Sequence, residues 1–343
     1  ALETLEADRP VCRFIDACHG ERQVPVSLDF ATGGTQRLGL ANCNLEDASL
    51  APLTALLAEM KHVEEVDLED NSCLTDKSLG PFLKALCSRA VASSMLRLNL
   101  SGCRRMGPAA HAAIADLVVR HAEDLRSIDL AGVKITMRSY LTLAVGISTH
   151  RRLQEVCLSD TGLGIGLAAG CSKVVADLLS CRSLLSLDVG WSTFSAEVCA
   201  DIGENLRRCK QLETLILPNC TTAACSPKGD FAIEHFLEHI WVNRGLKKLD
   251  ISQNMVSYSG ALIAEDVLEG HPSLTELDVS HNSLGIIGLR SMVRLISTLP
   301  RVKRLGCESC GPQASAEGMI FSPSSLLGKY ELDLERPCHR ALL

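Results

Sequence analysis

A six-residue phrase with apolar residues at its first and third positions recurs ten times along the chain. Its sixth position, called the turn slot below, is most often Asn or Cys. Successive copies are 28 to 34 residues apart. The copies begin at Leu38, Val66, Leu98, Ile128, Val156, Leu187, Leu215, Leu249, Leu277 and Leu305. A repeat of this length is one supersecondary unit that must stack on its neighbours, so the chain is predicted to form a solenoid.

The phrase has the period of a β-strand. Its first and third side chains are expected to enter the core while the second faces water. The turn slot has to direct the chain inward and stay small, and Asn there can satisfy backbone groups through hydrogen bonds. A buried Cys acts as a small hydrophobic residue. The cysteines in turn slots are therefore predicted to be core thiols: Cys43, Cys103, Cys220 and Cys310.

Each turn is followed by a segment with the period of a helix. Residues Pro108 to Arg120 and Phe231 to Trp241 both place apolar side chains on one face at helical spacing. A unit of strand, turn and helix cannot bury its apolar face alone, so neighbouring units have to stack. We expect parallel strands on the inner, concave side of the solenoid and helices on the outer, convex side.

Between Arg37 and Cys310 this strand and helix phrase resembles the ribonuclease-inhibitor-type leucine-rich repeat family. The resemblance implies an α/β fold, a leucine-rich repeat horseshoe of about ten to eleven repeats. It also implies binding of other macromolecules on the strand-lined face. Members of the family include enzyme inhibitors, GTPase activators, innate immune receptors and cytoskeletal scaffolds.

The two ends of the chain differ from the array at residues 37–310. Residues 1–36 are predicted to form a capping segment, in which Val26 to Phe30 alternates like a strand and leads through a Gly33-Gly34 turn into a hairpin. At the other end, Tyr330 to Leu334 is expected to form an eleventh strand. Residues 311–343 are then either an atypical last repeat, a C-terminal cap, or the point where a longer protein was cut.

Composition narrows the functional classes. The chain has 34 basic and 41 acidic residues and a formal charge of −7, which argues against nucleic-acid binding. No apolar run reaches the roughly 18 residues of a membrane span. Sixteen cysteines in a chain of this length, without a secretory signal, favour free thiols in a reducing compartment. We therefore expect a cytoplasmic protein with no membrane partner.

Three short motifs resemble catalytic or metal sites. His235 to His239 matches His-x-x-Glu-His, but it lies on a helix face that is expected to be solvated. Cys307 and Cys310 have the spacing of half a zinc site without the second half. Gly162 to Gly170 resembles a dinucleotide-binding loop inside an ordinary repeat turn. The sequence predicts no enzyme activity, catalytic residue, cofactor or metal.

Acidic residues concentrate on the expected inner face. The solvent-facing positions of the ten strands and their turns hold twelve acids and four bases, an excess of eight negative charges. A large aromatic residue there is typical of an interface anchor. The predicted partner-binding residues are Asp67, Asp129, Glu155, Asp160, Asp188, Trp191, Asp250, Glu276, Asp278 and His281. An alternative stays open, in which Asp between two core residues serves only as a polar residue on the solvent-facing side of the strand and has no role in binding.

These features predict a non-enzymatic protein-interaction module or scaffold. Its partner is expected to be a protein with a basic surface, because complementary charge raises the association rate and the selectivity of binding. Three alternatives remain: a GTPase-activating or regulatory protein, the sensor or substrate-receptor part of a larger protein, and a structural subunit of a large assembly.

Overall fold

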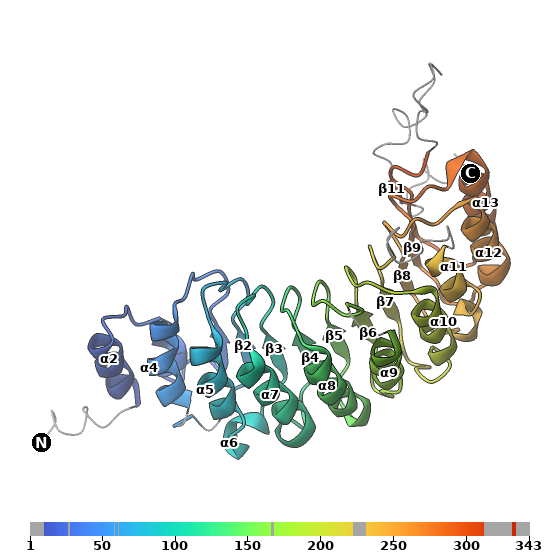
Figure 1. Cartoon of the computed structure of the whole chain (residues 1–343). Helices are drawn as coiled ribbons and strands as arrows, with labels where there is room; N and C mark the ends of the chain where they lie inside the picture. Colours follow the sequence, from blue (N-terminus) through green and yellow to red (C-terminus); the bar gives the residue numbers. More distant parts are fainter. Residues whose placement is uncertain are drawn as a thin grey trace, which may run out of the picture. The chain divides into compact units, whose positions relative to one another are not determined.

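The computed structural model describes residues 10–26, 28–57, 59–60, 62–165, 168–221, 231–311 and 331–333. The chain divides into two compact units, Ala1–Thr161 and Gly162–Leu343. In each unit short strands alternate with helices, and the strands line one side while the helices line the other (Figure 1). The predicted α/β leucine-rich repeat solenoid is confirmed.

The elements of unit 1 follow the predicted repeat. Its described strands are β1 (Arg37–Gly39), β2 (Glu65–Asp67), β3 (Arg97–Asn99), β4 (Ser127–Asp129) and β5 (Glu155–Cys157). Its described helices are α2 (Pro10–Gly20), α3 (Leu28–Ala31), α4 (Asp47–Leu57), α5 (Asp76–Leu86), α6 (Arg89–Ala92), α7 (Pro108–Asp116), the π-helix η1 (Leu117–His121) and α8 (Met137–Thr149).

Unit 2 continues the same order. Its described strands are β6 (Ser186–Asp188), β7 (Thr214–Ile216), β8 (Lys248–Asp250), β9 (Glu276–Asp278), β10 (Arg304–Gly306) and β11 (Glu331–Asp333). Its described helices are α9 (Ala168–Leu179), α10 (Ala196–Asn205), α11 (Ala232–Leu237), the 3₁₀ helix η3 (Ile240–Val242), α12 (Tyr258–Leu268) and α13 (Gly285–Thr298).

Neighbouring strands within each unit pair in parallel and in register. The first core residue of each phrase pairs with its counterpart one repeat later, as Leu38 does with Val66 and Leu249 with Leu277. These side chains are buried beneath the strands. The strand predicted at Tyr330 to Leu334 is present as β11, but it pairs antiparallel to β10. The rest of residues 312–343 lies outside the described residues.

The expected N-terminal hairpin is wrong. Where Val26 to Phe30 was expected to be a strand, the structure has the helix α3, and the turn at Gly33 follows it. Phe30 is fully buried and α2 packs against α4, so helices form the capping segment. A run of only five residues is too short for its period to distinguish a strand from a helical turn, which explains the error.

Two predicted helices change type before they end. The helix expected from Pro108 to Arg120 is α-helical to Asp116 and then becomes the π-helix η1. The helix expected from Phe231 to Trp241 consists of α11 and the short 3₁₀ helix η3. Among the described helices, none combines the length and the apolarity that a membrane crossing needs.

Several turn-slot side chains bond to the preceding repeat. In the slot at Asn71, Nδ2 donates to the carbonyl of Leu40 at 2.8 Å and Oδ1 accepts from the N–H of Leu45 at 2.9 Å. The slot thiol of Cys103 donates to the carbonyl of Leu68 at 3.4 Å, again one repeat earlier. These slot side chains therefore satisfy backbone groups that the preceding repeat leaves open.

Cys43 is the exception. It was predicted to be a core thiol, but it is exposed and its Sγ bonds only the nearby carbonyl of Ala41. It occupies the slot of the first repeat, which has no preceding repeat to cover it. The other turn-slot cysteines, Cys103, Cys220 and Cys310, are fully buried as predicted.

The N-terminus of α7 is also capped from the preceding repeat. Helix α7 begins after Gly107, which has no side chain to cap it, and the Asp76 carboxylate accepts the N–H groups of Ala109 and Ala110 at 3.0 and 2.7 Å. A Cβ on Gly107 would collide with the Asp76 side chain, so glycine is required at this close approach. An acidic group at this end also interacts favourably with the helix dipole.

Candidate protein-binding face

All ten predicted partner-binding residues lie on the strand-lined side, in a strand or in the turn that follows it. Unit 1 carries Asp67, Asp129, Glu155 and Asp160, and unit 2 carries Asp188, Trp191, Asp250, Glu276, Asp278 and His281. We call these two surfaces the strand faces of unit 1 and unit 2. Trp191, His281, Glu155 and Asp160 are exposed, and the other six are half-buried.

The aspartates between the two core positions have a local structural role. Asp67, Asp129, Asp188, Asp250 and Asp278 each accept, through Oδ1, the backbone N–H of the residue two positions later. The N to O distances are 2.9 to 3.1 Å. These bonds form Asx turns that lead the chain out of the strand. The structure thus gives a physical reason for Asp in this column besides partner binding.

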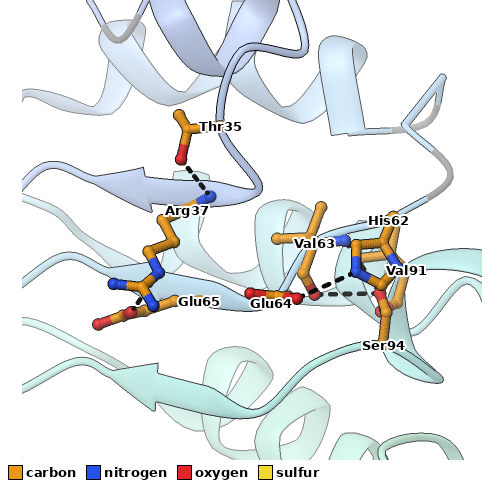
Figure 2. Close-up of polar contacts among 8 residues, drawn as sticks. All are labelled: Thr35, Arg37, His62, Val63, Glu64, Glu65, Val91 and Ser94. Atoms are coloured by element: carbon orange, nitrogen blue, oxygen red, sulfur yellow. Dashed lines mark hydrogen bonds and ion pairs between the residues drawn. The ribbon is translucent and has the colours of Figure 1, made fainter.

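Two acids of the predicted set have a base on a neighbouring strand or turn. Lys248 lies 3.5 Å from Glu276, and Lys134 lies 2.6 Å from Asp160. Figure 2 shows the same arrangement in unit 1, where the guanidinium of Arg37 lies 3.5 Å from the carboxylate of Glu65. Side-by-side pairs of opposite charge are favourable across strands. They leave these positions less acidic than the sequence count suggests.

A surface depression of about 260 Å³ lies at the start of the strands of unit 1. Charges of both signs line it, from Arg37, Glu65, Arg97, Arg126 and Glu155. Sequence reasoning missed Arg126, because it precedes the strand by one residue and fell outside the positions that were counted. On this strand face the acidic surface is therefore interrupted by arginines.

The strand face of unit 2 carries two aspartates on adjacent strands. Asp250 and Asp278 pair side by side in β8 and β9. Within the described ranges, neither carboxylate forms an ion pair. Both carboxylates also contribute to raising the pKa of nearby buried thiols, although burial is the main cause: Asp250 acts on Cys220, and Asp278 acts on Cys310, whose pKa rises to about 12.

The residue before the turn slot has a left-handed backbone in all ten repeats. Its φ lies between 50° and 73°. The residues are Asn42, Asp70, Gly102, Gly132, Asp160, Trp191, Asn219, Gln253, His281 and Ser309. The backbone N–H of Trp191 donates to the carbonyl of Pro218 at 2.7 Å, and that of His281 donates to the carbonyl of Glu308 at 2.6 Å. These backbone hydrogen bonds to the next repeat hold the left-handed conformation. The conformation directs the side chain away from the core.

Trp191 is unusual in this position. Gly, Asn and Asp are the residues that adopt positive φ most readily, whereas a bulky side chain there is strained. The φ of Trp191 is 55°, and 51% of the residue is exposed. Core packing does not explain a strained, half-exposed indole at this position. Sequence reasoning selected Trp191 for its size alone and had no sign of the strain.

The motifs that resembled catalytic sites have structural explanations. Gly164 has a φ of 89° and lies so close to the backbone of Thr193 that a Cβ would collide with it. Cys307 and Cys310 are buried, and the Sγ of Cys310 donates to the carbonyl of Val279 at 3.0 Å. His235 lies 3.8 Å from Glu238 on the surface of unit 2.

Comparison with known proteins agrees with this architecture. The family model described as Leucine Rich repeat matches residues 270–293, which include β9 and the first part of α13. The chain is 24% identical to the ribonuclease inhibitor of Sus scrofa over 93% of its own length and 74% of that protein. The chain is therefore a leucine-rich repeat solenoid, and it is similar to proteins of the ribonuclease-inhibitor type. As a leucine-rich repeat protein, it is a protein-binding repeat module.

Two solved structures are also similar to this leucine-rich repeat protein. One is the tropomodulin C-terminal domain of Caenorhabditis elegans, with 12% identity, a TM-score of 0.35, and coverage of 56% of this chain and 92% of that chain. The other is the complex of Rad7 and Elc1 in yeast, with 12% identity, a TM-score of 0.35, and coverage of 93% of this chain and 92% of that chain.

Proposed function

We propose that this leucine-rich repeat protein binds a basic protein partner on the strand face of unit 2 and has no catalytic activity of its own. The observation that carries the proposal is Trp191, held half-exposed in a left-handed conformation that costs stability. Tryptophan is enriched among the residues that dominate binding energy at interfaces. The row of Asp250 and Asp278 supplies negative charge on the same face.

The similarity to the ribonuclease inhibitor of Sus scrofa supports a protein as the partner. The name of this relative states that it inhibits ribonucleases, which makes a ribonuclease the first candidate partner to test. On this proposal the acidic row attracts the partner at long range, since opposite charges raise the association rate. The indole of Trp191 would then be desolvated in the complex and slow its dissociation.

Free thiols support a reducing, cytoplasmic location as part of the proposal. Nine of the described cysteines are free thiols, and most of these are buried or half-buried. The nine are Cys18, Cys43, Cys73, Cys87, Cys103, Cys171, Cys209, Cys220 and Cys310. Burial raises the pKa of Cys171 and Cys209 to about 12, so these thiols stay protonated and poorly reactive. On this part of the proposal, the partner is also a cytoplasmic protein.

The test removes charge without removing the Asx turns. In a triple variant with Asp188→Asn, Asp250→Asn and Asp278→Asn, each amide oxygen can still accept the backbone N–H that the carboxylate accepted. The matched control, Glu204→Gln, Asp266→Asn and Glu269→Gln, removes three charges from exposed positions on the helical side of unit 2. Binding is measured by surface plasmon resonance with a pancreatic ribonuclease and with the proteins that the wild-type chain retains from an extract of its source organism.

We expect the strand-face variant to bind basic partners about 3- to 100-fold more weakly, at roughly 0.2–1 kcal/mol for each lost contact. The loss should appear mainly in the association rate and shrink at high salt. The control variant should bind like the parent. Equal losses in both variants, or partners that bind as tightly to the strand-face variant as to the parent, would overturn the proposal.

A further inference from the structure

Three ligand-type side chains meet on the helical side of unit 1. The Sγ atom of Cys87, a carboxylate oxygen of Asp116 and a ring nitrogen of His121 all lie within 4.8 Å of one another. Cys87 follows the last residue of α5, Asp116 ends α7, and His121 ends η1. Helices α5, α6 and α7 are neighbours in Figure 1. Among the described residues, this is the one group of three or more such side chains that could hold a metal ion.

The π-helix creates this meeting. In an α-helix of about 3.6 residues per turn, residues five apart lie on different faces. In η1 the N–H of Ala122 bonds the carbonyl of Leu117 at 2.9 Å, a five-residue step. That step places the His121 ring beside Asp116, with Nε2 and Oδ2 3.4 Å apart. Single π-helical turns are rare and occur often at functional sites.

We propose that Cys87, Asp116 and His121 form a zinc site with three protein ligands and a fourth position open to water. Thiolate, imidazole and carboxylate are the three ligand types that Zn²⁺ takes in proteins, and catalytic-type zinc sites have three protein ligands and one exchangeable ligand. Mg²⁺ and Ca²⁺ prefer oxygen ligands alone, so a sulfur and nitrogen donor set selects against them. All three residues are half-buried, which leaves an ion access from solvent.

The groups around the cluster must rearrange only slightly to admit the ion. Arg120 pairs with Asp116 at 3.1 Å, but its side chain is 71% exposed and can turn into solvent. The Cys87 thiol donates to the carbonyls of Leu83 and Ala113 at 3.4 and 3.8 Å, which are long, weak hydrogen bonds. Binding breaks the S–H bond of Cys87, releases its proton to solvent and forms the sulfur–zinc bond with the electron pair left on sulfur.

Burial and the nearby carboxylate of Asp116 raise the pKa of Cys87 to about 11, so the thiol is protonated at neutral pH while no cation is present. A divalent ion reverses this preference, because a coordinating thiol is deprotonated outright. The site lies on the helical side, away from the strand face of the same unit, so it is independent of the proposed partner binding.

The experiment uses the whole chain, stripped with a chelator and kept reduced. Zn²⁺ is titrated in competition with a chromogenic chelator into the parent and into single variants Cys87→Ala, Asp116→Asn and His121→Ala. The matched control combines Cys73→Ala and His62→Ala, an exposed thiol and an exposed imidazole of the same unit that lie outside the cluster. We expect one tight equivalent of Zn²⁺ in the parent and in the control.

Each cluster variant should lose more than the roughly 10- to 100-fold that the loss of an outer-shell partner costs. Co²⁺ bound to the parent should show a thiolate-to-metal charge-transfer band that Cys87→Ala abolishes. This band keeps the test decisive if a variant fails to fold. A parent that shows no such band, or a cluster variant that binds Zn²⁺ as tightly as the control, would overturn the proposal.

Discussion

The Oδ1 atom of Asn282 accepts the backbone N–H of Asn254 at 2.8 Å, and Asn254 occupies the same turn slot one repeat earlier. Asn254 in turn accepts the N–H of Cys220 at 2.8 Å and donates to the carbonyl of Leu217 at 2.6 Å. Three successive slots in unit 2 are thus linked in one direction, each completing the repeat before it.

Asn254→Ala should be strongly destabilising for this reason. The substitution leaves the N–H of Cys220 and the carbonyl of Leu217 buried without their partner, and each such group costs roughly 1–3 kcal/mol. We expect urea unfolding to show a loss of at least about 2 kcal/mol. The control is Asn205→Ala at the end of α10, whose side chain bonds within its own helix. Similar losses of unfolding free energy in both variants would show that the hydrogen bonds of the turn slot contribute no more to stability than those within a helix.

The turn slots of Cys220 and Cys43 should respond differently to the same change. Cys220 is fully buried, so Cys220→Asp places an unpaired charge in the core, where burying a charge is strongly unfavourable. We expect a loss of several kcal/mol or failure to fold. Cys43 is exposed, and Cys43→Asp should unfold like the parent. Urea melts of the two variants measure the difference, and a stable Cys220→Asp variant would contradict the burial of this slot.

Thiol reactivity should follow burial. Cys43 and Cys73 are exposed, while burial raises the pKa of Cys103 to about 11 and that of Cys310 to about 12. Brief treatment of the native chain with iodoacetamide near pH 8 should label Cys43 and Cys73 and spare the other two, because only the thiolate reacts. Peptide mass spectrometry locates the label. In denaturant without reductant, all sixteen thiols should react, and a count lower by four or more would indicate disulfides.

Trp191→Gly should separate stability from binding. Glycine adopts positive φ without the cost that a bulky side chain carries, so the variant should be as stable as the parent or more stable by about 1 kcal/mol. Its complexes should nevertheless dissociate faster, with little dependence on salt, because the change removes buried area and not charge. Gln253→Gly, at the same left-handed position two repeats later and outside the predicted partner-binding set, is the control. Loss of stability without loss of binding would show that the indole serves the fold.

Acid should weaken the contact between the first two repeats of unit 1. The carboxylate of Asp47 accepts the N–H of Thr75 at 2.8 Å and the hydroxyl of Ser78 at 2.6 Å. Burial alone would raise the pKa of Asp47, but these hydrogen bonds lower it below its ordinary value. Its contribution is therefore full above the unfolded pKa of about 3.9 and is lost as the pH falls through the lower folded value.

Asp47→Asn removes the charge and should cost about 0.5–2 kcal/mol at pH 7, as the loss of a helix cap does. The difference from the parent should shrink as the pH falls below 4. Thermal unfolding at several pH values measures it, with Glu46→Gln at the neighbouring exposed position as control. A difference that stays constant with pH would show that the charge of Asp47 is not involved.

The repeat and its register could be predicted from the sequence because they rest on apolar spacing. Leu38, Val66 and Leu98 define the core side of three strands by period alone, and the structure pairs them in register. The left-handed position could not be predicted, since residues as different as Trp191 and Gly132 occupy it. Its conformation comes from a backbone bond to the next repeat, which a local pattern does not contain.

The candidate sites show the same limit. The sequence placed Asp188 and Asp250 on the strand side, but their Asx turns depend on the N–H two residues later pointing back at the carboxylate. The cluster of Asp116 and His121 has no sequence signal, because five residues do not match the period of an α-helix. Only the π-helical step, together with Cys87 from the previous repeat, reveals it.

The backward direction of the slot bonds has a consequence for synthesis. Chains leave the ribosome N-terminus first and fold as they emerge. The carbonyl of Leu217 and the N–H of Cys220 find their partner only when Asn254 has been made, 34 residues after Cys220. A nascent chain therefore always carries one unfinished repeat at its growing edge, and a ribosome that stalls after Cys220 holds a last repeat that a chaperone or protease can still recognise.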